Sequence, residues 1–84
     1  MTVRSVVTPT GFWVGTNESD RLFVELLAPS PFPVVVGKKV SFVGFVDPNH
    51  DDSAERFGLV GQDADELRAQ GYHLHVEASA LHQD

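Results

Sequence analysis

Cysteine is absent from this chain of 84 residues, and its absence excludes several kinds of site at once. Without thiols the protein has no disulfides, no thiolate zinc site and no cysteine nucleophile. Packing alone must therefore stabilise a domain near the small end of what folds unaided. The lack of cysteine does not fix the compartment, so a cytoplasmic and an exported location both stay open.

Basic residues are scarce as well. Six Lys and Arg stand against twelve Asp and Glu, which gives a formal net charge of -6. Proteins that bind nucleic acids draw most of their non-specific affinity from neutralising phosphates with basic side chains. This charge balance therefore predicts that nucleic acids and other polyanions are weak partners.

Long apolar runs and catalytic motifs are also missing. A run such as residues 34–36 is far too short to cross a bilayer, so no membrane span is expected. No Gly-x-Ser-x-Gly, phosphate loop or dinucleotide fingerprint occurs, and we expect no enzymatic activity. What is present is an ordinary 42% of hydrophobic residues, which predicts one soluble globular domain over residues 1–84.

The stretch of residues 12–27 predicts the hairpin around which the domain is built. Aromatic and β-branched residues on both sides of the polar segment 16–20 are typical of two strands joined by a turn. Alternation along the second strand places three aliphatic residues on the face expected to point into the core: Leu22, Val24 and Leu26. The opposite, outer face would then carry Trp13 and Phe23 close to Glu25.

Three further strands are expected, over residues 2–7, 40–46 and 72–80. The strand over 40–46 reads as buried on most of both faces, and Gly44 in its middle indicates a bulge or sharp bend. Residues 28–33 have a proline at alternate positions, which predicts an extended connector, and residues 34–36 are expected to add a short strand.

Two short helices are expected between the fourth and fifth long strands. The first is a single turn over residues 54–57. The second has Asp63 as its N-cap, Glu66 three residues later, and Gly71 where a helix-ending glycine belongs. Residues 81–84 read as a tail.

Residues 12–15, 21–26 and 37–46 resemble the second, third and fourth strands of OB-fold domains, most of all small OB-like domains of bacterial proteins of unassigned role. The shared pattern is an apolar-acidic-apolar triplet around Glu25, a turn led by Gly37, Val40, and the mid-strand Gly44. The resemblance implies a mainly β fold, a small five-stranded OB-like barrel with its helices between strands four and five. OB domains usually carry their helix between strands three and four, so an SH3-like barrel is the alternative.

The resemblance also implies a binding surface on strands two and three, where OB domains stack ligands on aromatic side chains. We therefore expect a binding or interaction module that recognises a protein, a peptide or an uncharged ligand without a cofactor. The residues expected to contact that ligand are Trp13, Phe23, Glu25 and Phe45. Mutation of Trp13 to Ala should then abolish binding and leave the fold intact. A single-stranded nucleic-acid-binding OB domain is the alternative function.

A second alternative is a metal site on the last strand. His73, His75 and Glu77 alternate onto one face, and zinc accepts imidazole and carboxylate ligands. Structural zinc sites normally use four ligands, so this face reads more simply as the solvated outer face of an edge strand.

Overall fold

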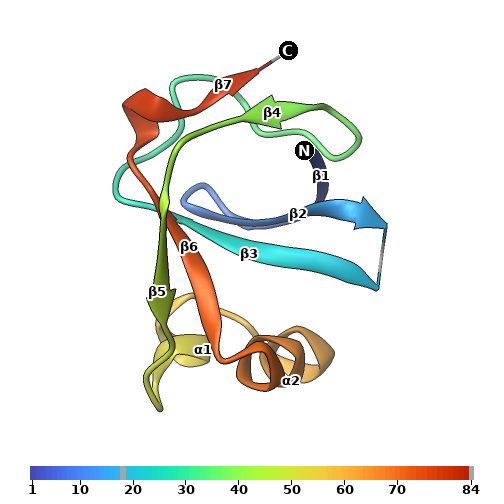
Figure 1. Ribbon diagram of the computed structural model, residues 1–84, viewed down its shortest axis with the longest axis vertical. Helices are drawn as coiled ribbons and strands as arrows, with labels where there is room; N and C mark the ends of the chain where they lie inside the picture. The colour runs from blue at the N-terminus through green and yellow to red at the C-terminus, as the bar shows by residue number, and fades with distance from the viewer. Residues whose placement is uncertain (18, 84) are drawn as a thin grey trace.

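The computed structural model describes residues 1–17 and 19–83 (Figure 1). Glu18, expected in the hairpin turn, and Asp84, expected in the tail, lie outside the described residues. The strands are β1 (Thr2–Thr8), β2 (Gly11–Asn17), β3 (Asp20–Leu26), β4 (Val40–Ser41), β5 (Phe45–Pro48), β6 (Tyr72–Val76) and β7 (His82–Gln83). The helices are α1 (Ser53–Arg56), α2 (Gly61–Gln70) and a short 3-10 helix, η1 (Ala78–Ala80). Among the described residues, no helix combines the length and apolarity needed to cross a bilayer.

The main sheet is mixed and has the strand order β1-β2-β3-β6-β5. Strands β1, β2 and β3 form an antiparallel meander, β6 runs parallel to β3, and β5 runs antiparallel to β6. Strands β4 and β7 form a separate two-stranded sheet. The domain is therefore mainly β with two α-helices, as predicted, but its five-stranded sheet is open and no closed barrel is found in the part of the chain that is described.

Two hydrophobic clusters lie on opposite faces of the main sheet. The first cluster lies between this sheet and the small one, and consists of Val3, Phe12, Val14, Val24, Leu26, Val40, Val76 and Leu81. The second cluster lies between the sheet and the helices, and consists of Trp13, Phe23, Ala54, Leu59, Ala64 and Leu67. Figure 1 shows the helices and the small sheet at opposite ends of the molecule. Strands β2 and β3 therefore contribute alternate residues to both clusters.

The predicted outward position of Trp13 and Phe23 is wrong, because both side chains are 0% exposed. Alternation assigned them correctly to the face opposite Val24 and Leu26, but α1 and α2 cover that face. The two rings meet edge to face, with centroids 5.3 Å apart. In the observed register of the hairpin Phe12 lies opposite Val24, whereas the sequence-based expectation pairs Phe12 with Leu26.

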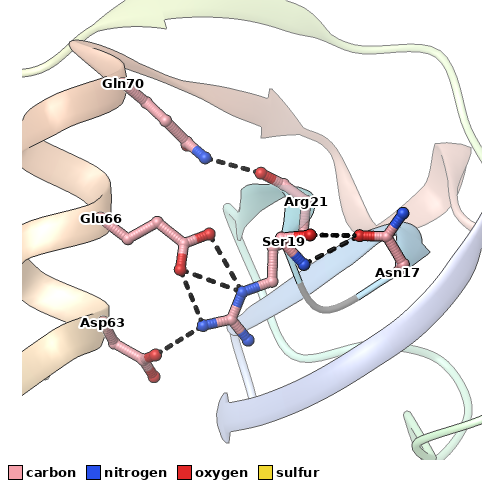
Figure 2. Close-up of polar contacts among 6 residues, drawn as sticks. All are labelled: Asn17, Ser19, Arg21, Asp63, Glu66 and Gln70. Atoms are coloured by element: carbon pink, nitrogen blue, oxygen red, sulfur yellow. Dashed lines mark hydrogen bonds and ion pairs between the residues drawn. The ribbon is translucent and has the colours of Figure 1, made fainter.

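Helix α2 is held to the sheet by a cluster around Arg21 (Figure 2). The Arg21 guanidinium bonds Asp63 at 2.8 Å and Glu66 at 3.0 Å, and Gln70 Nε2 donates to the Arg21 carbonyl at 2.6 Å. The prediction of Asp63 as the N-cap is wrong, because the N-cap is Val60, and Asp63 lies inside the first turn of α2 and contacts β3. Gly71 ends the helix with a φ of 78°, a left-handed conformation that suits glycine, as predicted.

The predicted strand over residues 40–46 is divided into β4 and β5, with irregular backbone at 42–44. Gly44 crosses β6 so closely that a Cβ there would lie 2.8 Å from the His75 carbonyl oxygen, which explains a glycine at this bend. The prediction that both faces of this segment are buried is wrong. Val43 and Phe45, on either side of the crossing at Gly44, are both exposed to solvent. The short strand expected over residues 34–36 is not formed, and this segment is irregular.

The end of the chain is not the tail that was predicted. Leu81 is buried in the first cluster, and β7 pairs with β4, so that Ser41 lies opposite His82. The predicted last strand is correspondingly shorter, because it stops at Val76 and η1 turns the chain toward the small sheet.

Candidate functional site

A groove lies where the helix-covered face of the main sheet continues beyond the helices. Glu25 on β3 pairs with His75 on β6, and His75 pairs with Phe45 on β5, so the three side chains share one face of the sheet. Side chains around them enclose a cavity of about 510 Å³ lined by Leu27, Val43, Phe45, His75, Glu77 and Ala80. We call this cavity the β5 groove.

The floor of the β5 groove is apolar and open to water. Val43 is 80% exposed, Phe45 is 73% exposed and Leu27 is 58% exposed. Leu27 directly follows β3, whereas Val43 lies just before β5 and Phe45 begins it, and these two segments meet because β3, β6 and β5 are neighbours in the sheet. Contiguous exposed apolar surface of this kind marks interaction sites more often than isolated exposed residues do.

Carboxylates dominate the charge around the groove. His75 Nδ1 lies 3.1 Å from Glu25 Oε1 and 3.5 Å from Asp47 Oδ2, while Glu77 is exposed at the groove itself. Among the described residues, neither lysine nor arginine lines the groove. The site therefore combines apolar contact surface with an electrostatic preference for cations.

His73 lies behind this cluster, under the edge of the helices. Asn49 Nδ2 donates to the Leu67 carbonyl at 2.7 Å, which orients the Asn49 amide so that its Oδ1 accepts from His73 Nδ1, also at 2.7 Å. The other ring nitrogen of His73 faces Glu25 Oε1 at 3.6 Å. Burial lowers the pKa of His73, and the nearby Glu25 and Asp47 carboxylates oppose that shift.

The predicted site residues divide into two groups in the structure. Four of them meet at or beside the groove: Glu25, Phe45, His75 and Glu77. The other three are buried beneath the helices: Trp13, Phe23 and His73. Val43 and Leu27 were missed, although each stands two positions from a predicted residue, Phe45 and Glu25, and so shares its face in an extended chain.

The two alternative sites gain no geometric support. Within residues 1–17 and 19–83 there is no group of three or more His, Cys, Asp and Glu side chains arranged to hold a metal ion. Of the three aromatic residues proposed for base stacking, Trp13 and Phe23 are buried and Phe45 is exposed beside carboxylates.

A second hollow, of about 590 Å³, lies between the end of β1 and the proline-rich connector at residues 29–34. Its lining carries no charged side chain, so its chemistry does not select one kind of ligand. The β5 groove has both an apolar floor and a defined charge. Comparison of the chain with protein-family models, with curated proteins and with solved structures found no match, and the chemistry of the groove is therefore the guide to what it binds.

Proposed function

We propose that this domain is a protein- or peptide-interaction module and that its binding site is the β5 groove. The observation that carries the proposal is the convergence of Leu27, Val43 and Phe45 on one hollow, all of them largely exposed. Removing such side chains from water favours association by about 25 cal/mol for each Å² of apolar surface, before the entropic cost of binding is subtracted. An aromatic side chain such as Phe45 is suited to be the central anchor of the interface.

The proposed function is still an interaction module, as the sequence predicts, but its binding site is the β5 groove and not the surface of the second and third strands. The expected surface on strands β2 and β3 is covered by helices, whereas the adjoining surface on β3, β6 and β5 is open. A polypeptide suits this surface better than a nucleic acid does, because Glu25, Asp47 and Glu77 would repel phosphates.

We also propose that the fold is OB-like, as a partly open barrel. The antiparallel meander of β1, β2 and β3 supports this relationship. Backbone bonds bring residues 37–40 to the outer edge of β1, with Val3 N donating to Lys38 O at 2.9 Å and Val40 N donating to Met1 O at 2.7 Å. OB folds are five-stranded and partly open, so these contacts fit incomplete closure.

Selection of random linear peptides displayed on phage against the purified chain tests the binding site. We expect the recovered peptides, made synthetically, to lose at least about tenfold in affinity for Phe45→Ala, which corresponds to about 1.4 kcal/mol. The matched control is Val60→Ala, since Val60 is 80% exposed and lies outside the groove. Because both side chains are exposed, neither substitution should lower the melting temperature appreciably.

The proposal fails if the recovered peptides bind Phe45→Ala as tightly as they bind the unmodified chain. A single-stranded oligothymidine probe at low salt represents the rival class. We expect it to leave the amide resonances of the groove unchanged, and a salt-sensitive perturbation of them would favour nucleic-acid binding instead.

A further inference from the structure

Strand β5 forms one edge of the main sheet, and β6 is its one partner strand among residues 1–17 and 19–83. Its residues lie opposite those of β6 in a regular antiparallel register, from Phe45 opposite His75 to Pro48 opposite Tyr72. No strand within the described parts of the chain pairs with the other edge of β5. An edge of this kind presents unpaired backbone groups on which another extended chain can add.

The hydrogen-bond alternation identifies the backbone groups that this edge offers. Asn49 N donates to Gly71 O at 3.0 Å and so extends the ladder between β5 and β6 by one residue. In an antiparallel ladder every second residue faces the partner strand, so Phe45 and Asp47 face β6, as Asn49 does. Val46 therefore directs both its N–H and its C=O toward the free edge.

Pro48 fits the same alternation. Proline has no N–H, and in this register the Pro48 nitrogen points to the free edge. The hydrogen bonds between β5 and β6 are therefore complete without it. The available edge is consequently short. An added strand would form its central pair of bonds with Val46 and would end at Pro48.

The side chains of β5 define what an added strand has to carry. Phe45 and Asp47 flank Val46 and lie on the groove face. In a paired strand, the residues on either side of the one that bonds Val46 would stand next to them, at about 5 Å between Cβ atoms. An apolar side chain is favoured beside Phe45 and a basic one beside Asp47.

We propose that the β5 groove binds an extended segment of a partner protein by strand addition to β5. This segment has an apolar residue and a Lys or Arg two positions apart. The inference rests on the proposed function and specifies the partner. Charge complementarity selects this occupant, because Glu25, Asp47 and Glu77 surround the groove, and because a second copy of a chain with net charge -6 would bring like charges together.

The probes are terminally blocked peptides of seven residues in a threonine background, with lysine at the third and leucine at the fifth position. In an antiparallel added strand whose fourth residue bonds Val46, this order places lysine beside Asp47 and leucine beside Phe45. Two further peptides carry a single N-methyl group, either on the fourth or on the fifth backbone nitrogen. Strand addition bonds only alternate backbone nitrogens to β5. We therefore expect one methylated peptide to lose at least about tenfold in affinity and the other to bind like its parent, as measured by NMR titration. The peptide should also slow hydrogen exchange at the Val46 amide.

A charge exchange tests the basic position. Asp47→Lys should weaken the lysine peptide and strengthen a matched peptide with glutamate in place of lysine. Asp47 is half exposed, and the fold of the variant is checked by circular dichroism and NMR. The N-methylated peptides give a readout on the unmodified chain, so the proposal stays testable if this variant fails to fold.

The remaining outcomes distinguish failure of strand addition to β5 from failure of the β5 groove as the interaction site. If both methylated peptides bind as well as the parent and Phe45→Ala abolishes binding, the groove is the site and strand addition is wrong. If the leucine-lysine peptide does not bind, while peptides recovered by selection still require Phe45, the partner chemistry is wrong and the interaction site stands. If sedimentation shows a dimer whose Val46 amide is already protected without peptide, a second copy occupies the edge and the peptide proposal is overturned.

Discussion

The protonation of His73 is linked to folding through its buried position. Its ring is buried against Phe57, with centroids 4.9 Å apart, and its Nδ1 bonds Asn49, so the fold favours the neutral ring and the pKa of His73 is lowered. In the unfolded chain the pKa returns to about 6.5, and below that pH the unfolded state binds more protons than the folded one. The stability contributed by neutral His73 is thus fully present above about pH 6.5 and is lost as the pH falls toward the lowered folded-state value.

We expect the free energy of unfolding to fall more steeply between pH 7.5 and 5.5 for the unmodified chain than for His73→Asn, over about the window where histidine titrates. Asparagine places an amide nitrogen near the position of Nδ1, so it can still donate to Asn49, but it does not titrate. Urea unfolding at several pH values measures the difference. Parallel curves for the two proteins would mean that His73 is not the linked group.

At the scale of elements, the Arg21 cluster is the main polar attachment of α2 to the sheet. The Arg21 side chain is 10% exposed, bonds two carboxylates of α2 and stacks 4.5 Å from the centroid of the Trp13 ring. Charge-assisted bonds with this little exposure contribute more than surface ion pairs do. We expect Arg21→Met to lower the free energy of unfolding by about 2 kcal/mol, because it leaves Asp63 and Glu66 without their partner.

Arg68→Met is the matched control for this prediction. Arg68 belongs to α2 itself, is 54% exposed and reaches Glu55 and Asp65 only at 3.5 Å. Its loss should change the free energy of unfolding by less than about 0.5 kcal/mol. Equal effects of the two substitutions in urea unfolding would contradict the role assigned to Arg21.

Sequence patterns over a few residues predict most helices and strands of this fold, because each helix or strand depends mainly on residues that are neighbours in the chain. The hairpin follows from alternation on both sides of the polar segment 16–20, and the end of α2 follows from Gly71. Whether a face of the sheet is buried or exposed depends instead on segments that are distant in sequence. Nothing near Trp13 in the sequence indicates that residues 53–70 fold over it, and nothing near Leu81 indicates that β7 completes the small sheet.

The candidate site divides in the same way. The resemblance to OB domains suggests Phe45 as an aromatic residue for ligand contact, although its own segment is predicted to be buried, and alternation on one strand groups His75 with Glu77. Their meeting with Glu25 requires the parallel pairing of β3 with β6, which joins residues about fifty positions apart in the chain. Alternation cannot reveal that pairing, since it describes each strand alone.

For the whole molecule, the decisive feature is that one sheet serves two clusters. Strands β2 and β3 contribute Phe12 and Val24 to the first cluster, and Trp13 and Phe23 to the second. The loss of either cluster would therefore expose the back of the strands that hold the other. In a domain of this size, with a stability of about 5 to 10 kcal/mol, the two clusters should unfold in one transition.

Leu81→Ala tests this coupling from the far end of the chain. Leu81 is buried in the first cluster, and its truncation should cost roughly 2 to 4 kcal/mol, in the range for buried leucines. Trp13 is the single tryptophan and lies in the second cluster, so its fluorescence reports the opposite face of the sheet. We expect the urea midpoint followed by Trp13 fluorescence to fall as far as the midpoint followed by far-ultraviolet circular dichroism, whereas Val60→Ala should move neither. A fluorescence midpoint that stays in place while the dichroism midpoint falls would mean that the two faces unfold separately, because the small sheet could then detach without disturbing the packing of Trp13 against the helices.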